Sequence, residues 1–444
     1  MRDPGRPNII LMICHDLGCH LPCYGIHGPR TPILDRIAAE GIVLERYFAA
    51  APMCSPSRGA ILTGCYPHTN GLLGLVNMGW ELGEQSPTLP HLLRARAGYH
   101  TALIGIQHEK QDARRMGYQR VLSPAPRACE ALPTALTFLR QRADEPRDPF
   151  FLSIGLAEMH RPYALPGYVP GPLPEVVVPG YLPPSAGVRQ ELAEFHGLIH
   201  NVDEQIGPLF DLLRSADGPR NTLVIFTTDH GIAFPRAKST LYDSGIATAC
   251  LLWWPGMLPA GRRIPHVLSN VDLCPTILDV ASVPAPQSIQ GRSFRPLLMA
   301  DCDGCDQRNC IYAENTFHTC YDPRRAVRTS RWKYIRAFEP GPDLALLHDI
   351  AAQPSAVAMA KRFTAPRAAE ELYDLSVDPD ETCNLADVPR WCGVRDELSA
   401  RLTDWMRQTE DPLLSAPIPL APDAFCIGPY RPGEDPGPIR PWRY

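Results

Sequence analysis

Four short apolar runs constrain most strongly how this chain can fold. They occupy residues 8–14, 101–105, 150–155 and 222–226 and consist mainly of large aliphatic and aromatic residues. Runs of this length and composition are typical of strands that are buried on both faces of a parallel sheet. Segments with helical patterns separate them, so the sequence predicts an α/β fold.

Polar side chains follow each of these runs within a few residues. In chain order they are His15 and Asp16, His108, Glu158 and His160, and Asp229 and His230. Ligands of open α/β sheets bind beyond the carboxyl ends of the strands, so these groups are predicted to meet in one crevice. A loop position in water is the alternative for each of them. It is least plausible for Asp16, Asp229 and His230, which follow their strands almost immediately.

The clearest helical pattern lies between the third and fourth runs. From Val188 to Leu213, apolar residues recur at alternating spacings of four and three, which places them on one face of a long helix. Pro32 and Gly41 suit the first position and the end of a shorter helix. A further helix is predicted over residues 270–279. We expect these helices to pack on the sheet.

The pattern changes after about residue 305. Short segments of alternating polarity predict an antiparallel sheet, and a helical pattern follows them: the segments are 311–314, 325–328, 332–336 and 371–375, and the helix is 398–409. We therefore predict an α/β domain over residues 1–305. A smaller α+β subdomain with a proline-rich tail is predicted over residues 306–444.

Composition excludes several classes of partner. The net charge is −5 at pH 7, which argues against a nucleic-acid-binding surface. No apolar run approaches the roughly 20 residues of a membrane helix, and the N-terminus does not resemble a secretory leader. We therefore expect a cytoplasmic protein without nucleic-acid or membrane partners, with its fifteen cysteines reduced.

Residues 54–58, Cys-Ser-Pro-Ser-Arg, contain the most informative thiol of the chain. Ser55 is a favourable N-cap, Pro56 suits the first helical position, and Gly64 can end the helix. The sulfur of Cys54 is then predicted to lie near the positive end of a helix, where the pKa of a thiol is lowered. On these facts alone, a reactive thiol and a buried structural cysteine are equally good interpretations.

The same five residues match the Cys-x-Pro-x-Arg signature of the type I sulfatases, the formylglycine-dependent members of the alkaline phosphatase superfamily. Residues 62–71 resemble the extended part of that signature. Other segments also resemble the family: Asp229–Gly231, 238–245, Asp272–Thr276, Glu371–Asp374 and 378–385. The run from Phe226 to Tyr242 is most similar to the heparan N-sulfatase-like branch.

The resemblance implies an alkaline-phosphatase-like fold, in which helices flank a large mixed sheet and a smaller antiparallel subdomain lies at the C-terminus. Residues 1–305 would form the catalytic domain. The resemblance also implies that a formylglycine-generating enzyme oxidises Cys54 and that the hydrated aldehyde then attacks sulfur. The implied activity is hydrolysis of a sulfate ester or sulfamate in a small anionic substrate, such as a sulfated carbohydrate or an aryl sulfate.

The resemblance implies a divalent metal ion with four ligands: Asp16, Asp229, His230 and the modified Cys54. Hard oxygen ligands suit Ca²⁺ or Mg²⁺, and Ca²⁺ is the first expectation. Most relatives carry aspartate at the place of His15. This histidine either ligates through nitrogen, which favours Mn²⁺ or Zn²⁺, or lies outside the ligand shell.

The resemblance assigns four side chains to catalysis: Arg58, His108, His160 and Lys238. Arg58 would hold the hydrated aldehyde, and His108 would deprotonate the hydrate so that sulfate is expelled. His160 and Lys238 would contact the sulfate oxygens and the leaving atom. Ile106 replaces a second family lysine, and the loss of such a charged contact costs ~1.5–3 kcal/mol.

Four residues of the C-terminal part are candidates for substrate binding: His318, Glu314, Arg325 and Arg328. Charged residues of this kind also occur on surface strands, which is the alternative interpretation. The proline-rich segment 162–184 is long enough to shape a substrate pocket.

Two other functions fit the same residues. The missing aspartate and lysine are compatible with a phosphodiesterase or phosphonate monoester hydrolase on the same scaffold, because diester substrates carry less charge. A degenerate relative that binds sulfated sugars without hydrolysing them is the second alternative. The intact nucleophile motif, Asp229, His230 and Lys238 argue against it.

Overall fold

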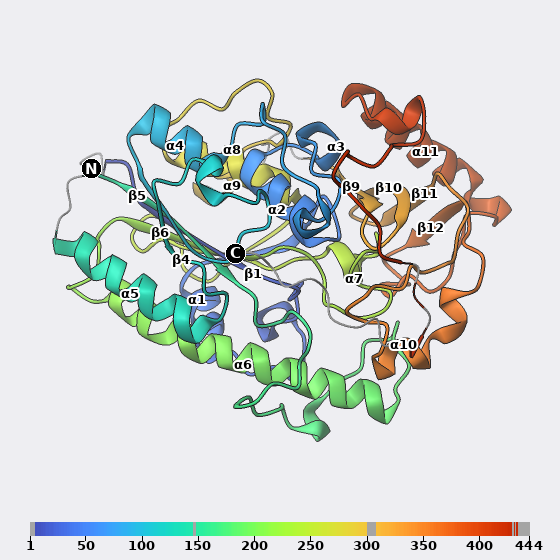
Figure 1. The fold of residues 1–444 in the computed structure, drawn as a ribbon, viewed down its shortest axis with the longest axis horizontal. Coiled ribbons are helices and arrows are strands. Elements are labelled where there is room, and N and C mark those ends of the chain that lie inside the picture. The colour runs from blue at the N-terminus through green and yellow to red at the C-terminus, as the bar shows by residue number, and fades with distance from the viewer. Residues whose placement is uncertain (1–4, 145–147, 300–307, 429, 431, 434–444) are drawn as a thin grey trace.

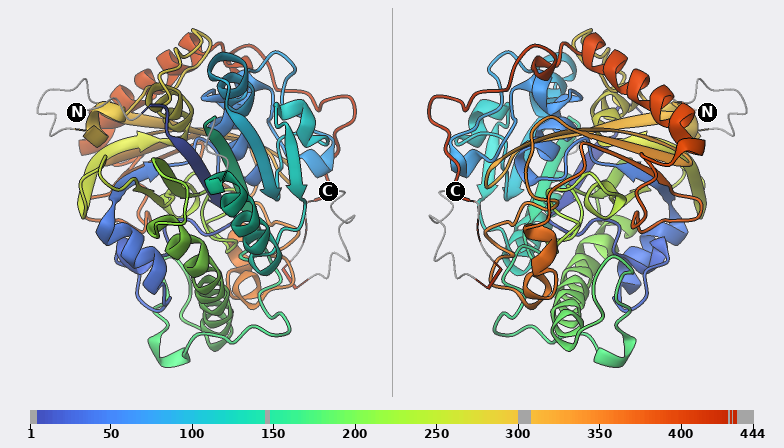
Figure 2. Two further views of the ribbon diagram at one scale, coloured as in Figure 1. Left: turned by 90° about the vertical axis from the view of Figure 1, so that its left-hand side faces the viewer. Right: turned by 90° about the vertical axis from the view of Figure 1, so that its right-hand side faces the viewer.

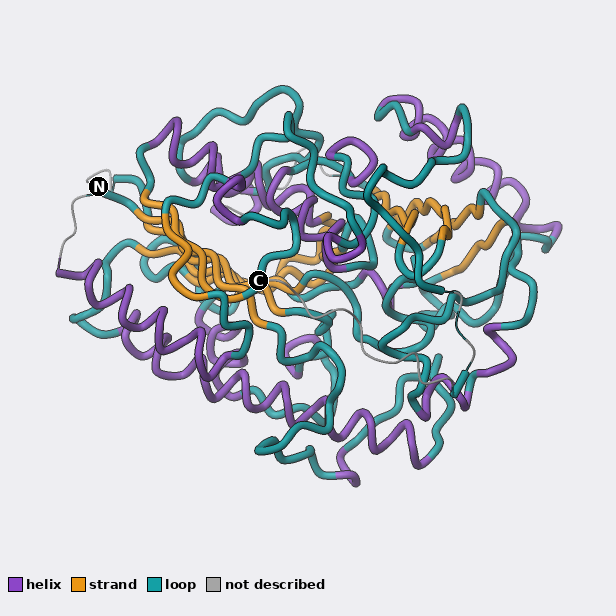
Figure 3. Tube along the Cα trace, viewed as in Figure 1, coloured by secondary structure: helices purple, strands orange, loops and turns teal. Residues whose placement is uncertain are grey.

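The computed structural model describes residues 5–144, 148–299, 308–428, 430 and 432–433 of the chain. An eight-stranded sheet forms the centre of the larger part, and a four-stranded sheet lies beside it toward the C-terminal end of the chain (Figures 1 and 3). Helices flank the larger sheet. The predicted fold class, a large mixed sheet with helices and a smaller antiparallel unit, is confirmed.

The large sheet has the strand order β4-β3-β5-β1-β6-β7-β2-β8. In that order the strands are Arg120–Ser123, His100–Gly105, Phe150–Leu156, Asn8–Cys14, Thr222–Thr228, Cys250–Trp253, Ile42–Phe48 and Arg262–Ser269. Neighbouring strands are parallel except at β7, which runs antiparallel to both β6 and β2. The four strands predicted from the sequence are the contiguous set β3, β5, β1 and β6. Their carboxyl ends therefore share one edge of the sheet.

Helices cover both faces of the large sheet (Figures 1 and 2). One layer contains α1 (Pro32–Glu40), α5 (Ala128–Asp144) and α6 (Ala186–Arg214), and the other contains α2 (Cys54–Thr63), α4 (Leu89–Ala97), α8 (Leu273–Val280) and α9 (Arg295–Met299). Alternate residues of β1 face the two layers, with Ile10 and Met12 in one core and Ile9 and Leu11 in the other. Burial on both faces explains why this strand is a continuous apolar run.

Shorter elements complete the chain. They are the helices α3 (Pro67–Asn70), α7 (Asp243–Ile246) and α10 (Pro354–Ala358), and 3₁₀ helices at Pro22–Tyr24, Val76–Met78, Ala113–Met116, Leu173–Glu175, Asn270–Asp272, Ala360–Phe363, Pro389–Trp391 and Pro412–Leu414. In the described residues, no helix combines the length and the apolar character needed to cross a bilayer.

Helix α2 begins earlier than predicted. Cys54 is its first residue and Met53 is its N-cap, so Ser55 is not the cap. The hydroxyl of Ser55 instead accepts a hydrogen bond from the backbone N–H of Val76 at 3.2 Å. Gly64 ends the helix in the left-handed region with φ 68°, as predicted. The thiol of Cys54 therefore lies in the first turn, at the positive end of the helix dipole.

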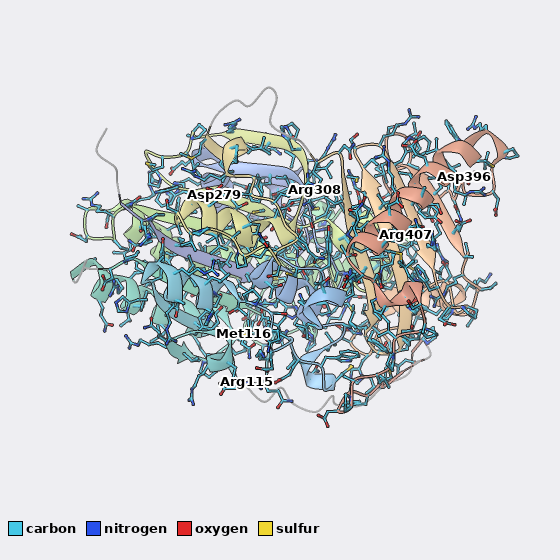
Figure 4. All side chains as sticks on the ribbon, turned by 90° about the horizontal axis from the view of Figure 1, so that it is seen from above. Arg115, Met116, Asp279, Arg308, Asp396 and Arg407 are labelled. Atoms are coloured by element: carbon cyan, nitrogen blue, oxygen red, sulfur yellow. The ribbon has the colours of Figure 1, made fainter. Side chains whose placement is uncertain are left out.

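The smaller sheet is antiparallel, with the order β12-β11-β10-β9. In that order the strands are Glu370–Asp374, Trp332–Ala337, Tyr321–Thr329 and Cys310–Phe317. Helix α11 (Cys392–Gln408) packs on it through Leu402 and Trp405, and Figure 4 shows Asp396 and Arg407 on this helix. The predicted domain boundary at 305/306 falls between the described residues 299 and 308, so it stays a prediction.

Backbone contacts join the two sheets and the described part of the proline-rich tail. The N–H of Glu314 on β9 donates to the carbonyl of Ala50 at 2.8 Å. In the tail, the N–H of Phe425 donates to the carbonyl of Met78 at 3.1 Å. These contacts hold the described part of the tail against the rest of the molecule.

Candidate active site

The residues expected beyond β1 and β6 form one buried cluster. Asp16 follows β1 in the left-handed region with φ 51°. Its N–H donates to Oδ1 of Asp229 at 3.0 Å, although the two residues are 213 positions apart. The other oxygen of Asp229 accepts from Nε of Arg58 at 3.2 Å. All three residues are buried.

Cys54 lies against these carboxylates. Its Sγ is 3.3 Å from Nε2 of His230 and 3.9 Å from Oδ1 of Asp16. Nδ1 of His230 is 2.9 Å from the carbonyl of Gly231, which makes Nδ1 the donor and leaves Nε2 with its lone pair toward the cluster when the ring is neutral. The first turn of α2 thus presents the sulfur to an imidazole and a carboxylate.

Charges within the cluster shift several pKa values. Burial favours the neutral thiol of Cys54, but the positive charges of His15 and Lys238 outweigh it and lower the thiol pKa to about 7. Burial also disfavours a charged His15, but Asp16 and the thiolate raise its pKa to about 10. Burial would raise the pKa of Asp16, but the positive charges of His15 and Lys238 hold this pKa well below its usual range. These shifts favour the reactive interpretation of Cys54.

The side chains fit a divalent cation. The ligand atoms of four of them lie within 4.8 Å of one another: those of His15, Asp16, Cys54 and His230. Asp229 adjoins them, with Oδ1 3.7 Å from Nε2 of His230. Nδ1 of His15 is 2.7 Å from Asp16, and its Nε2 is buried without a hydrogen-bond partner among the described residues. Carboxylates combined with imidazole nitrogens suit Ca²⁺, Mn²⁺ or Zn²⁺ to different degrees.

Lys238 lies on the loop between β6 and α7. This loop is anchored by the buried side chains of Ala237 and Leu241. Its Nζ donates to Oδ2 of Asp16 and to Oδ2 of Asp349, both at 2.8 Å. Burial opposes the charged form, but these two carboxylates raise the pKa of Lys238 well above its usual value. The ammonium group is therefore a permanent positive charge beside the cluster.

His108 and His160 complete the cluster on the side of β3 and β5. The centroid of each ring is 5.2 Å from that of His15. Burial, together with the charges of His15 and Arg58, lowers the pKa of His108 well below its usual value. Burial and the charge of Lys238 lower the pKa of His160 to about 4. Both imidazoles are therefore neutral near pH 7 and able to accept a proton.

The substrate-binding candidates of the C-terminal part separate in the structure. His318 lies near the cluster, since Lys238 and Asp349 are among the charges that act on it. Glu314 instead accepts from the N–H of His68 at 2.9 Å and pairs with Arg325 at 3.2 Å.

Arg328 forms its ion pair outside the cluster, with Asp243 at 2.9 Å. The charges of Glu314, Arg325 and Arg328 are thus already matched by protein groups. Glu158, the polar residue after β5, is used structurally as well, since it accepts from the N–H of Ala128.

Two buried groups at the cluster carry no sequence signal of their own. Asp349 lies in an irregular segment between β11 and α10, and its contact with Lys238 spans 111 positions. Tyr163 lies in the proline-rich segment that was expected to shape the pocket, and its hydroxyl is buried without a hydrogen-bond partner among the described residues. Only the packing of distant segments brings Asp349 to the cluster, whereas Tyr163 follows His160 by three residues.

Comparisons with known proteins agree with this geometry. A sequence profile described as Sulfatase matches residues 7–283, and one described as N-sulphoglucosamine sulphohydrolase, C-terminal, matches residues 236–362. Human N-sulphoglucosamine sulphohydrolase is 28% identical over 471 aligned residues, which cover 93% of this chain and 92% of the human protein.

Solved structures share the fold. The structure of a protein in complex with its substrate, D-glucosamine-2-N,6-O-disulfate, superposes with a TM-score of 0.69 at 20% identity, covering 93% of this chain and 100% of that chain. The phosphonate monoester hydrolase of Agrobacterium radiobacter superposes with a TM-score of 0.70 at 18% identity, covering 92% and 97%.

The fold and the buried cluster define a hydrolase of the alkaline phosphatase superfamily. The Sulfatase profile alone covers more than half of the chain. The chain belongs to the sulfatase family and is a sulfuric ester hydrolase.

Proposed function

We propose that this protein is a formylglycine-dependent sulfatase that acts on a sulfated sugar at a divalent metal site. The position of Cys54 carries this proposal. Its sulfur lies in the first turn of α2, 3.3 Å from His230 and 3.9 Å from Asp16. The sulfur stands in for the oxygen that formylglycine would carry at this place. That oxygen would then face both the ligand cluster and an incoming sulfate.

Formylglycine, made from Cys54 by a formylglycine-generating enzyme, supplies in its hydrated form one hydroxyl that attacks sulfur and a second that allows sulfate to be expelled as the aldehyde returns. Arg58 keeps Asp229 in place through its hydrogen bond at 3.2 Å. Arg58 and Lys238 also offset the negative charge of a bound sulfate. The neutral imidazole of His108 accepts the proton of the hydrate. His160 contacts the leaving oxygen or nitrogen.

A divalent cation bound at the cluster would neutralise charge on the sulfate oxygens and would lower the pKa of the attacking hydroxyl. Asp16, Asp229, His230 and the modified Cys54 would hold it. Oxygen ligands favour Ca²⁺. A nitrogen ligand from His15 favours Mn²⁺ or Zn²⁺, whereas a His15 that only bonds Asp16 leaves Ca²⁺ preferred.

The proposed substrate class is a sulfated amino sugar, as a sulfate ester or a sulfamate. Support comes from the printed names of the relatives: a human sulphohydrolase of N-sulphoglucosamine, and a structural neighbour with a glucosamine disulfate. The profile described as N-sulphoglucosamine sulphohydrolase, C-terminal, spans Lys238, His318 and Asp349, three residues in or near the cluster.

Mass spectrometry of the tryptic peptide Tyr47–Arg58, from protein made in its native host, tests the nucleophile. We expect the mass loss that accompanies conversion of the thiol to an aldehyde. An unmodified thiol would reject the formylglycine mechanism. If the protein also lacked a metal ion, the alternative of a non-catalytic sulfated-sugar binder would be favoured.

A second candidate activity is hydrolysis of phosphodiesters or phosphonate monoesters. The observation that favours it is the reduced charge of the cluster, with His15 and Ile106 at the places of the family aspartate and lysine. Relative kcat/KM values for 4-nitrophenyl sulfate and bis(4-nitrophenyl) phosphate distinguish the two. We expect the sulfate to be preferred, and a preference for the diester would reverse the assignment.

A further inference from the structure

Three buried polar atoms beside Lys238 have no hydrogen-bond partner among the described residues. They are Oδ1 of Asp349, Nδ1 of His318 and Oη of Tyr163. The side chain of Asp349 is 9% exposed, and His318 and Tyr163 are 7% and 3% exposed. Nearly all buried polar groups in proteins are paired, because leaving one unpaired is destabilising. Three such atoms around one site indicate a ligand that completes their hydrogen bonds.

These three side chains lie in the neighbourhood of Lys238. Asp349 is closest to the reacting groups, since its Oδ2 is 2.8 Å from Nζ of Lys238. One oxygen of Asp349 also lies within 4.8 Å of ligand atoms of Asp16 and His160. Lys238 and Asp349 are among the charges that act on both His318 and Tyr163. Asp349 thus borders the place where the group that carries the sulfate would lie, with His318 and Tyr163 in its neighbourhood.

The chemistry of the three atoms specifies their partner. An ionised carboxylate only accepts hydrogen bonds, so Oδ1 of Asp349 requires an O–H or N–H donor. The hydroxyl of Tyr163 can donate and accept, and the imidazole of His318 offers either role according to its tautomer. A second sulfate or a carboxylate at this place would be repelled by Asp349. A sugar hydroxyl or an amino-sugar N–H satisfies all three groups.

Packing and hydrogen bonds hold the segment that carries Asp349. Leu347 and Ile350 are buried on either side of it, and the N–H of Ile350 donates to the carbonyl of Leu347 at 3.2 Å. Nδ1 of the neighbouring His348 is 3.1 Å from the hydroxyl of Tyr430 in the C-terminal tail. A side chain held in this way is preorganised for its ligand.

We propose that Asp349, assisted by Tyr163 and His318, is a specificity-determining residue that binds a hydroxyl or N–H donor on the sugar next to the scissile sulfate. The proposal rests on the sulfatase function argued above and names its substrate more narrowly. The preferred substrate carries a donor beside the sulfate, and a substrate with a second anionic group at that place is disfavoured.

Asp349→Asn tests this with two substrates. Glucosamine N-sulfate offers hydroxyl and N–H donors, whereas 4-nitrophenyl sulfate offers none. Asparagine keeps the size of the side chain and an oxygen for Lys238. We expect the loss of kcat/KM to be roughly 10- to 100-fold larger for the sugar than for the aryl sulfate, because both substrates lose the effect of Asp349 on Lys238 but only the sugar loses a hydrogen bond to Asp349. The matched control is Asp396→Asn on the outer helix α11, where the side chain is 65% exposed, and it should change neither value (Figure 4).

Equal losses for both substrates would overturn the proposal, because Asp349 would then act only by positioning Lys238. Calorimetry gives a readout without turnover, with glucosamine N-sulfate binding to the Cys54→Ala enzyme compared with the Cys54→Ala, Asp349→Asn enzyme. Weaker binding by the double variant supports the proposal, whereas equal binding, or binding by neither, overturns it. If the unmutated enzyme binds the sugar without hydrolysing it, the proposed function fails while the specificity site can still be confirmed.

Discussion

Replacing Asp16 by asparagine tests the metal cluster with little steric change. Asp16 has φ 51°, and asparagine tolerates this left-handed region better than most residues, so the variant removes charge rather than straining the backbone. The lost carboxylate oxygens lie 2.8 Å from Nζ of Lys238 and 2.7 Å from Nδ1 of His15. At an effective dielectric constant of about 20, a pair at 2.8 Å attracts by about 6 kcal/mol.

The variant does not lose all of this attraction energy, because His15 can release its proton and Lys238 still forms its ion pair with Asp349. We therefore expect a net loss of about 3–5 kcal/mol in the free energy of unfolding of the metal-free protein. We also expect at least a ~100-fold loss of kcat/KM, since the metal would be bound weakly. Urea denaturation, metal analysis after dialysis and kinetics measure the three quantities.

Two further variants serve as controls for the Asp16→Asn test. Asp16→Ala should be less stable than Asp16→Asn, because alanine is strained at this backbone conformation. Asp404→Asn, which changes a side chain that is 61% exposed on α11, should be indistinguishable from the unmutated protein. An Asp16→Asn protein that retains the metal and the activity would refute the assignment of the cluster.

Three further predictions concern the cluster and the packing around it. Removal of the metal by a chelator should abolish activity and lower Tm. The ion that restores both, among Ca²⁺, Mn²⁺ and Zn²⁺, is then the native one. Full activity after verified removal would contradict the assignment of a metal site to this cluster. Burial lowers the pKa values of His20 and His196, whose Nε2 atoms are 3.0 Å apart, to about 3 and about 4. Below pH 6.5 these two histidines take up protons only in the unfolded chain, so the free energy of unfolding decreases as the pH is lowered. In urea unfolding, the free energy of unfolding of His20→Gln should therefore be about 2 kcal/mol closer to that of the unmutated protein at about pH 5 than at about pH 7.5. Parallel pH profiles of the two proteins would disprove this. Arg325→Met removes the buried guanidinium that pairs with Glu314 and Asp411 and should cost about 3–5 kcal/mol in the same assay, and an unchanged midpoint would mean that these two ion pairs contribute nothing.

The elements that the sequence predicted are those whose residues are buried in a simple pattern. β1 and the strand at Thr222–Thr228 were predicted within two residues, because both faces of a central strand are covered and the run is therefore continuously apolar. Helix α6 was predicted for the corresponding reason, since its one buried face repeats with the helical period. β2 was missed, because Glu45 and Arg46 are exposed in its middle and interrupt the apolar pattern.

The candidates for the nucleophile and for the metal ligands come from short local motifs. Cys54 and Arg58 share one helical turn, and Asp229 and His230 are adjacent, so their relative placement is largely local. The strand order could not be read from the sequence, yet it decides the site, because β3, β5, β1 and β6 must be neighbours for their carboxyl ends to meet.

The sequence by itself determined the family and the α/β class and supplied the candidates for the nucleophile and the metal ligands, because each depends on residue types at fixed short spacings. Only the tertiary structure decided which distant side chains meet at the cluster. It placed Asp349 on Lys238 across 111 positions, and it matched Arg328 with Asp243 away from the cluster. Such contacts depend on how loops and sheets pack in three dimensions, and no local pattern of residues encodes that packing.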